Sequence, residues 1–446
     1  MNKRRQPRLG MVLSMLFVSF LAQAQTGTTH AFSVQQAVEY ARKNNVQVKN
    51  ALIDVLLQQQ SNKEITAAAY PSLSATGSFT DYIKIPTSLI PGDFVGQPGT
   101  YIPVQFGTKY IASGGFQLNQ LLFDGQVFVG LQARKTTIDF ASKKVEVTEE
   151  AIKTNIHKIY YQLVVSKTQI ELLDSTISRI EKLRHDVNET FKNGFAERLD
   201  VDKLDVQLIN LKTERQKAVN NIEMGYLGLK TLMGMPIKDS LVLTDRITET
   251  DLTAGILVDS VNYNERKEFQ LLQFGKQLNE YNIKRYKLSY LPTLSANANY
   301  SKQAQRNSFD FFGKGDWFTT SFVGFNLNVP IFSGFAKDAR LKHARLELQQ
   351  TENNIDNLKL TIDNDLMAAK LKIKSALESL EFQKKNMELA RRVTEQTEKK
   401  FFAGIGSNTE INTARLEQKT AETAYINALY DAIIAKVDFM KATGKL

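Results

Sequence analysis

The most regular pattern in the sequence is an apolar repeat between Ile152 and Phe191, in which steps of four and three residues alternate. Ten of its twelve positions are apolar: Ile152, Ile156, Ile159, Leu163, Ile170, Leu173, Ile177, Ile180, Val187 and Phe191. The other two positions hold Ser166 and Arg184. This heptad spacing predicts a long helix that winds around partner helices in a left-handed sense.

The same frame recurs 210 residues later, with smaller and more polar side chains. Its positions are Ile362, Leu366, Ala369, Ile373, Ala376, Leu380, Gln383, Met387, Ala390, Thr394, Thr397 and Phe401. Because the frame recurs without a slip, we predict two copies of a long coiled-coil helix. The chain is therefore expected to be mostly α, with a two-fold internal repeat.

A period-two pattern precedes each of these long helices. In the first half, Ser33 and Gln36 form a capping box that predicts a helix start. We expect that helix to run to Pro71, which ends it because proline lacks an N–H. Apolar and polar residues then alternate on both sides of a loop rich in proline and glycine. We predict one β-hairpin over 72–123 with a large exposed loop.

The second half follows the same plan. Leu291-Pro292-Thr293-Leu294 corresponds to Tyr70-Pro71-Ser72-Leu73, and Phe325-Asn326-Leu327-Asn328 corresponds to Phe116-Gln117-Leu118-Asn119. We therefore predict a second β-hairpin over 293–332.

Two runs without glycine or proline, 131–193 and 336–403, predict the long helices. As one helix, the first run would be about 95 Å long. Gly194 and Gly404 end these runs, and a return helix follows each glycine; the second return helix opens with a capping box of Ser407 and Glu410. Each half thus ends in a long helical hairpin. The two tips are placed at 191–200 and 401–410.

The N-terminus has the pattern of a secretory signal: a basic segment, an apolar run from Leu9 to Leu21, and Ala22-Gln23-Ala24. A membrane-anchor helix is the alternative, but the apolar run is short for a bilayer span. We predict a signal peptide over 1–24 and an exported chain without a helical membrane anchor. The remaining boundaries are a first repeat over 25–236, a connector with a short strand over 237–262, and a second repeat over 263–446.

Composition excludes several classes of function. The absence of cysteine excludes disulfides, zinc–thiolate sites and thiol nucleophiles. Neither the histidines nor the serines and carboxylates show metal-binding or catalytic spacing, so we expect no enzyme, no cofactor and no metal site. The histidines are His30, His157, His185 and His343. The net charge is +10, part of it in the N-terminal basic segment, so we expect no nucleic-acid partner.

The four predicted strands have about the ten residues of a membrane strand, and each has an apolar face suited to lipid. Four strands are too few to close a barrel, and an open edge inside a bilayer would leave backbone groups unpaired. The heptad positions of each long helix form an apolar seam, and these seams also require partner helices. We therefore predict a homo-oligomer that shares a strand barrel in the outer membrane and a helical barrel in the periplasm, which together form a duct.

Over essentially its whole mature length, the chain resembles the TolC-like outer-membrane efflux proteins. The resemblance rests on the internal repeat, on the two helix-to-strand junctions, and on two tip motifs. These motifs are Phe191-Lys192-Asn193-Gly194-Phe195-Ala196-Glu197-Arg198-Leu199-Asp200-Val201 and Phe401-Phe402-Ala403-Gly404-Ile405-Gly406-Ser407-Asn408-Thr409-Glu410-Ile411. The resemblance implies a homotrimer with a shared twelve-stranded barrel. It also implies the exit duct of a tripartite system, joined through a periplasmic adaptor to an inner-membrane efflux or ABC transporter.

The resemblance also implies roles for residues at the tips. The adaptor contacts would be Gly194, Phe195, Ala196, Gly404, Ile405 and Gly406. Asp200 and Glu410 would narrow the periplasmic entrance and attract cations. A second acidic position of some relatives holds Thr413 and Lys203 here, so a double acidic ring is not expected. Glu197 replaces the small or hydroxyl residue that is usual at its position.

Simpler interpretations stand beside these. Helix capping alone accounts for Asp200 and Glu410, because a carboxylate is favoured in the first turn of a helix. An exported structural or adhesive coiled-coil protein without a pore would explain the heptads but not the four amphipathic strands. A periplasmic adaptor has one helical hairpin, whereas this chain has two. The pattern fits small-molecule efflux and protein or peptide secretion equally, and leaves the adaptor and the resting state of the tips open.

Overall fold

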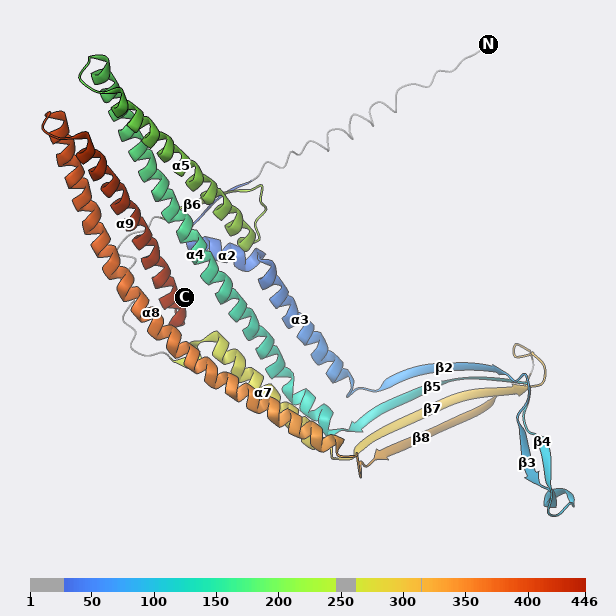
Figure 1. Cartoon of the computed structure of the whole chain (residues 1–446). Coiled ribbons are helices and arrows are strands. Elements are labelled where there is room, and N and C mark those ends of the chain that lie inside the picture. Colours follow the sequence, from blue (N-terminus) through green and yellow to red (C-terminus); the bar gives the residue numbers. More distant parts are fainter. Residues whose placement is uncertain (1–27, 246–261, 314) are drawn as a thin grey trace, which may run out of the picture. The chain divides into compact units, whose positions relative to one another are not determined.

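A computed structural model describes residues 28–245, 262–313 and 315–446 (Figure 1). The chain forms two compact units. The strand unit comprises Asp54–Ser142 and Leu271–Asp356, and the tip unit comprises Met1–Ile53, Lys143–Gln270 and Asn357–Leu446. The predicted signal peptide over 1–24, and residues 246–261 of the predicted connector, lie outside the described residues.

Four strands form an antiparallel sheet in the strand unit, in the order β2-β5-β7-β8. They are β2 (Ser72–Asp81), β5 (Tyr110–Phe123), β7 (Thr293–Arg306) and β8 (Phe318–Asn328). β2 pairs with β5 and β7 pairs with β8, which confirms the two predicted hairpins. The long loop of the first hairpin contains a smaller one, β3 (Thr87–Pro91) and β4 (Tyr101–Gln105), which the sequence pattern did not reveal.

The strand register places most apolar side chains of this sheet on one face. Leu73 lies opposite Leu118, Leu118 opposite Ala298, and Ala298 opposite Val323. Directly opposed residues share a face. A row of the other face is Ser74, Gln117, Asn299 and Phe322. Leu73 and Val323 are 69% and 73% exposed, so within the described residues this apolar face is left uncovered.

Helices lead into and out of the sheet: α3 (Val46–Ala67), α4 (Gly125–Lys192), α7 (Lys267–Leu288) and α8 (Ala336–Phe402). Within the strand unit, α3 packs on α4 through the buried side chain of Asn62. Its Nδ2 donates to the Arg134 carbonyl at 2.8 Å, and its Oδ1 accepts from the Thr137 hydroxyl at 3.1 Å. Similarly, Asn279 of α7 donates to the hydroxyl of Thr351 on α8 at 2.8 Å. Such paired polar groups favour one register between neighbouring helices.

The tip unit contains α2 (Val34–Asn44), α5 (Arg198–Met233) and α9 (Asn408–Ala442), together with the C-terminal parts of α4 and α8. β1 (Thr29–Phe32) pairs in parallel with β6 (Ser240–Leu243), which confirms the short strand expected in the connector. The buried hydroxyl of Tyr160 donates to the Phe32 carbonyl at 2.9 Å and accepts from the Asp245 N–H at 3.1 Å. Burial raises the pKa of Tyr160 to about 12, so the phenol remains a donor.

Both predicted seams face their return helices. On α4, Leu173, Ile177 and Ile180 pack with Val201, Leu204 and Leu211 of α5. On α8, Leu366, Ala369 and Ile373 pack with Ala435, Phe439 and Ala442 of α9. Both halves place a long helix and a return helix after their hairpin, while the internal repeat itself remains a prediction.

The first helix is interrupted, so the prediction of a continuous helix from Ser33 to Pro71 was wrong. α2 ends at Asn44, and α3 begins at Val46. The Oδ1 of Asn45 accepts from the N–H groups of Gln47 at 2.7 Å and Val48 at 3.2 Å, and its Nδ2 donates to the Leu232 carbonyl at 2.6 Å. Asn45 therefore caps α3 and ties it to α5.

Four glycines lie within α4 and α5: Gly125, Gly130, Gly225 and Gly228. α4 begins at Gly125 rather than at residue 131, and α5 continues through Gly225 and Gly228. A Cβ at Gly225 would lie 2.7 Å from Leu163 Cδ2, so glycine permits a close approach of α5 to α4.

Across 28–245, 262–313 and 315–446, no helix is both long and apolar enough to cross a membrane.

Candidate functional site

Each helical hairpin of the tip unit ends in a short loop (Figure 1), and the two loops have the same backbone hydrogen-bond pattern. After α4, the Phe195 N–H donates to the Thr190 carbonyl at 3.0 Å, and the Gly194 N–H donates to the Phe191 carbonyl at 2.9 Å. After α8, the Ile405 N–H donates to the Lys400 carbonyl at 3.1 Å, and the Gly404 N–H donates to the Phe401 carbonyl at 3.0 Å. This is the Schellman motif, which requires a left-handed residue after the helix. Gly194 and Gly404 have φ of 80° and 75°.

Each tip glycine is followed by an exposed apolar side chain. The residue after a Schellman glycine usually packs back on its own helix, as Met235 does after Gly234, with 4% exposure. Phe195 and Ile405 instead are 85% and 78% exposed. The two tips thus present apolar side chains that the described chain leaves uncovered.

The other tip residues singled out by the sequence are less exposed. Ala196 packs against the apolar cluster between α4 and α5. Gly406 is half-buried, and a Cβ there would lie 2.9 Å from the backbone nitrogen of Phe401. The six predicted contact residues therefore fall into two groups by exposure. Gly194, Phe195, Gly404 and Ile405 are exposed, whereas Ala196 and Gly406 support the turns.

The two predicted entrance carboxylates lie in the first turns of return helices. The Ser407 hydroxyl accepts from the Glu410 N–H at 3.1 Å, and the Glu410 carboxylate accepts from the Ser407 N–H at 3.5 Å, so the predicted capping box is formed. Asp200 is half-buried at the start of α5, where Glu197 is the N-cap residue and makes no side-chain capping hydrogen bond. Helix capping thus accounts for Glu410, and helix-dipole stabilisation favours Asp200.

Ion pairs join each long helix to its return helix below the tips. Between α4 and α5, Arg184 pairs with Asp205, Arg215 with Asp174, and Lys212 with Glu181. Between α8 and α9, the nearly buried Arg415 donates to Glu398 at 2.7 Å. The hydroxyl of Thr394, a seam position, donates to the Ala414 carbonyl at 3.0 Å. A polar seam residue is thus satisfied across the helix pair, as burial requires.

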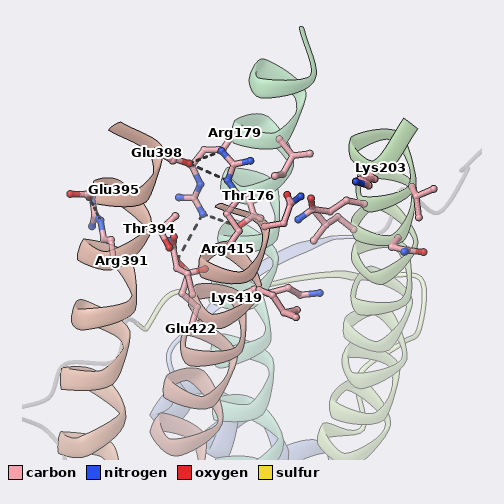
Figure 2. Close-up of a pocket in the computed structure, with 18 residues that line it drawn as sticks. Thr176, Arg179, Lys203, Arg391, Thr394, Glu395, Glu398, Arg415, Lys419 and Glu422 are labelled. Atoms are coloured by element: carbon pink, nitrogen blue, oxygen red, sulfur yellow. Dashed lines mark hydrogen bonds and ion pairs between the residues drawn. The ribbon is translucent and has the colours of Figure 1, made fainter. Parts of the chain in front are cut away.

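A cavity of about 460 Å³ lies where α4, α5, α8 and α9 meet in the tip unit (Figure 2). Ion pairs at this level connect the two helical hairpins. Arg179 of α4 lies 3.9 Å from Glu422 of α9, and Lys419 of α9 pairs with Glu214 of α5. Arg391 and Glu395, in contrast, pair along α8 itself at 3.1 Å.

Sequence analysis did not identify the residues of these cross-hairpin pairs. Arg179, Glu214, Lys419 and Glu422 lie off the heptad seams, and charged residues at such positions normally only solvate a helix surface. Their partners come from helices far apart in the sequence, so no local spacing reveals them. As for metals, no group of three histidine or acidic side chains in the described ranges is arranged to hold an ion.

Comparisons with known proteins find similarity to outer-membrane efflux proteins. Residues 264–445 match the family model described as outer membrane efflux protein. The Outer membrane protein TolC of Vibrio cholerae is 18% identical over 75% of this chain and 77% of its own length. The Outer membrane efflux protein BepC of Brucella suis is 22% identical over 92% of this chain and 85% of its own length. Among solved structures, CusC has the same fold, with a TM-score of 0.76, 14% identity, and coverage of 94% and 93% of the two chains.

Proposed function

Because the chain is a homologue of the TolC-like outer-membrane efflux proteins, we propose that it is an outer-membrane channel and the exit duct of a tripartite efflux or secretion system. In this proposal it is a passive conduit and not an enzyme. It docks through its tips to a periplasmic adaptor, which joins it to an inner-membrane efflux or ABC transporter.

The observation that carries the channel is the one-sided sheet. The row Leu73, Leu118, Ala298 and Val323 lies on the exposed apolar face, which suits contact with outer-membrane lipid. The outer edges of β2 and β8 have no strand partner among the described residues. A bilayer does not tolerate such edges, so other copies must pair with them. Three copies give the twelve-stranded barrel that the family resemblance implies.

A stripe on α8 supports a shared helical barrel in the periplasm. Leu360, Leu371, Phe382 and Val393 follow one another at steps of eleven residues, and each is 49–70% exposed. Eleven residues make close to three helical turns, so the stripe runs almost straight along the helix. The heptad seam of the same helix is already covered by α9. The exposed stripe therefore supports packing against a neighbouring copy.

The tips are proposed as the periplasmic entrance. Gly194, Phe195, Gly404 and Ile405 would contact the adaptor, with Ala196 and Gly406 shaping the turns beneath them. Phe195 and Ile405 carry this proposal, since each is exposed at a position whose side chain usually packs back on its own helix. Asp200 and Glu410 would add a carboxylate from each tip, which attracts cations to the entrance.

The cross-hairpin ion pairs provide a means of gating. We propose that a closed state is held by the ion pairs Arg179–Glu422 and Lys419–Glu214, which join the α8–α9 hairpin to the α4–α5 hairpin. Each of these partly exposed pairs contributes only about 0.2–1 kcal/mol. Contact with an adaptor can therefore outweigh them and let the hairpins separate.

The alternative, an exported structural coiled coil without a pore, does not account for the apolar sheet face. The two functions separate in a measurement of mass in solution. The channel requires detergent and forms a trimer, as analytical ultracentrifugation with detergent matching can determine. A chain that stays soluble and unaggregated without detergent would support the structural coiled coil instead.

A further inference from the structure

Two loops meet at one end of the four-stranded sheet, which we call its loop end (Figure 1). Asp81 ends β2 and lies opposite Tyr110, which begins β5; Tyr110 lies opposite Arg306, which ends β7. Residues 82–109 connect the first pair of strands, and residues 307–317 connect β7 to β8. Both loops therefore emerge from the sheet at the same end.

The longer loop exposes an unusual amount of apolar surface. Between Ile83 and Phe106 its charged residues are Lys84 and Asp93. Large apolar side chains at least half exposed are Ile83, Leu89, Phe94, Val95, Tyr101 and Phe106, and Ile83 is 95% exposed. β3 and β4 pair only with each other in the described chain, and an isolated two-stranded hairpin is marginally stable in water. This surface therefore indicates a missing partner.

The shorter loop is anchored on its own sheet. Phe309 and Phe311 each pack edge-to-face on Phe79 of β2, with ring centroids 5.6 Å apart. Arg306 places its guanidinium over the Phe311 ring and donates to Asp310. Phe312 nevertheless remains 96% exposed. Residues 309–312, held on the sheet and carrying one exposed aromatic side chain, offer a preformed docking surface.

The strand directions identify the partner. Neighbouring strands alternate in direction across β2-β5-β7-β8, so β8 of one copy can pair antiparallel with β2 of the next. The end of β2 at Asp81 and the start of β8 at Phe318 then lie at the loop end of the same interface. The segment after β2 in one copy thus adjoins the segment before β8 in its neighbour. Lys84 of the former and Asp316 of the latter have opposite charges.

We propose that the 82–109 loop of one copy docks on residues 307–313 and 315–317 of the neighbouring copy, so that a second copy of this chain covers Ile83 and Phe312. This inference rests on the proposed shared barrel and adds a lock between copies outside the strands. Charge complementarity of Lys84 and Asp316 sets its orientation.

The absence of cysteine from the chain makes the test direct. Ile83→Cys and Phe312→Cys chains with different affinity tags are co-expressed, and the purified oligomer is treated with a short bis-maleimide. A covalent dimer that carries both tags, on a denaturing gel, is the expected result. Co-expressed Phe195→Cys and Phe312→Cys chains are the control, because the proposed function places Phe195 in the periplasm. This control pair should give at least tenfold less of the doubly tagged covalent dimer.

Three outcomes separate failure of this inference from failure of the proposed function. The protein could form a trimer in detergent, yield no covalent dimer, and have both introduced thiols react freely with a bulky maleimide. That result would overturn the docking proposal and leave the proposed channel unaffected. Protection of the thiol of the Ile83→Cys chain only after transfer to lipid nanodiscs would also overturn it, because lipid would then be the cover. Loss of the trimer in the cysteine-free chain itself would contradict the proposed function.

Discussion

Lys158 and Asp438 form a close ion pair, with 2.6 Å between Nζ and Oδ1, that ties α4 to α9 in the tip unit. The other oxygen of Asp438 lies 2.9 Å from Nζ of Lys372 on α8. Burial alone would raise the pKa of Asp438, but the hydrogen bonds from Lys158 and Lys372 outweigh it and lower the pKa. One carboxylate therefore joins three helices of the two helical hairpins.

Replacing Asp438 with asparagine should destabilise the tip unit in a pH-dependent way. The change Asp438→Asn removes the negative charge and one of the two acceptor oxygens, and we expect a loss of about 1–2 kcal/mol in the free energy of unfolding at pH 7. Because the folded pKa is lowered, this stabilisation is present above the unfolded pKa of about 3.9 and is lost as pH falls through the folded value. Thermal unfolding of both proteins at pH 7 and pH 3 measures the difference. An equal difference at both pH values would show that the ion pairs are not its source.

The tip glycines should be sensitive to a single added methyl group. At Gly194 a Cβ would meet nothing within 4 Å, but φ is 80°. Gly194→Ala should therefore cost about 1–2 kcal/mol from backbone strain alone. Gly228 lies within α5 and also has open space around its Cβ position. Gly228→Ala should stabilise by about 0.5–1 kcal/mol. The midpoints of chemical denaturation of the two variants should shift in opposite directions from that of the wild type. A shift of both midpoints in the same direction would contradict the assigned turn geometry.

Weakening the cross-hairpin ion pairs should favour the open channel. The double variant Glu214→Gln/Glu422→Gln removes about 0.4–2 kcal/mol of closed-state stabilisation, a factor of about 2 to 30 in the closed-to-open ratio. Glu395→Gln is the matched control, because its partner Arg391 is on the same helix. Open probability in a planar bilayer is the readout. If the double variant and the control open equally often, these pairs do not hold the gate.

Charges at the exposed tips should block adaptor docking without affecting assembly. Phe195→Asp/Ile405→Asp places carboxylates where two apolar side chains are 85% and 78% exposed. We expect at least a tenfold loss of in-cell photo-cross-linking to the adaptor from a probe at position 192, with unchanged trimer mass. Ile237→Asp, at a 53% exposed apolar residue of the same unit, should leave cross-linking intact. Equal cross-linking in all three proteins would exclude Phe195 and Ile405 as contacts.

Patterns that depend on local sequence predicted much of the fold. The heptad positions Ile156 and Ile362 are buried in the structure, because side chains every three to four residues share one helix face. The alternation around Leu73 and Val323 gave both hairpins, since strands present alternate residues to one face. The capping boxes at Ser33 and Ser407 were also predicted correctly, because each is complete within four residues.

Features that depend on distant residues were missed. Glycine in general disfavours a helix interior, yet at Gly225 of α5 the lack of a Cβ admits Leu163 of another helix. Asn45 interrupts the first helix partly through its bond to Leu232. The ion pairs of Arg179 and Lys419 link helices more than 200 residues apart in sequence. From local sequence alone, a glycine indicates a helix end, an asparagine a polar surface position, and a charge a solvated surface. Only the contact with another helix reveals the different role that each residue has here.

Single-channel recording of the purified protein in a planar bilayer tests the central claim most directly. We expect discrete current steps from the wild-type trimer. In Asp200→Ala/Glu410→Ala, we expect higher conductance or reduced preference for cations, because carboxylates at the entrance attract cations and narrow the path. Steps from both proteins with identical conductance and selectivity would confine these two residues to helix capping. No current from either protein, with both soluble without detergent, would contradict the channel itself.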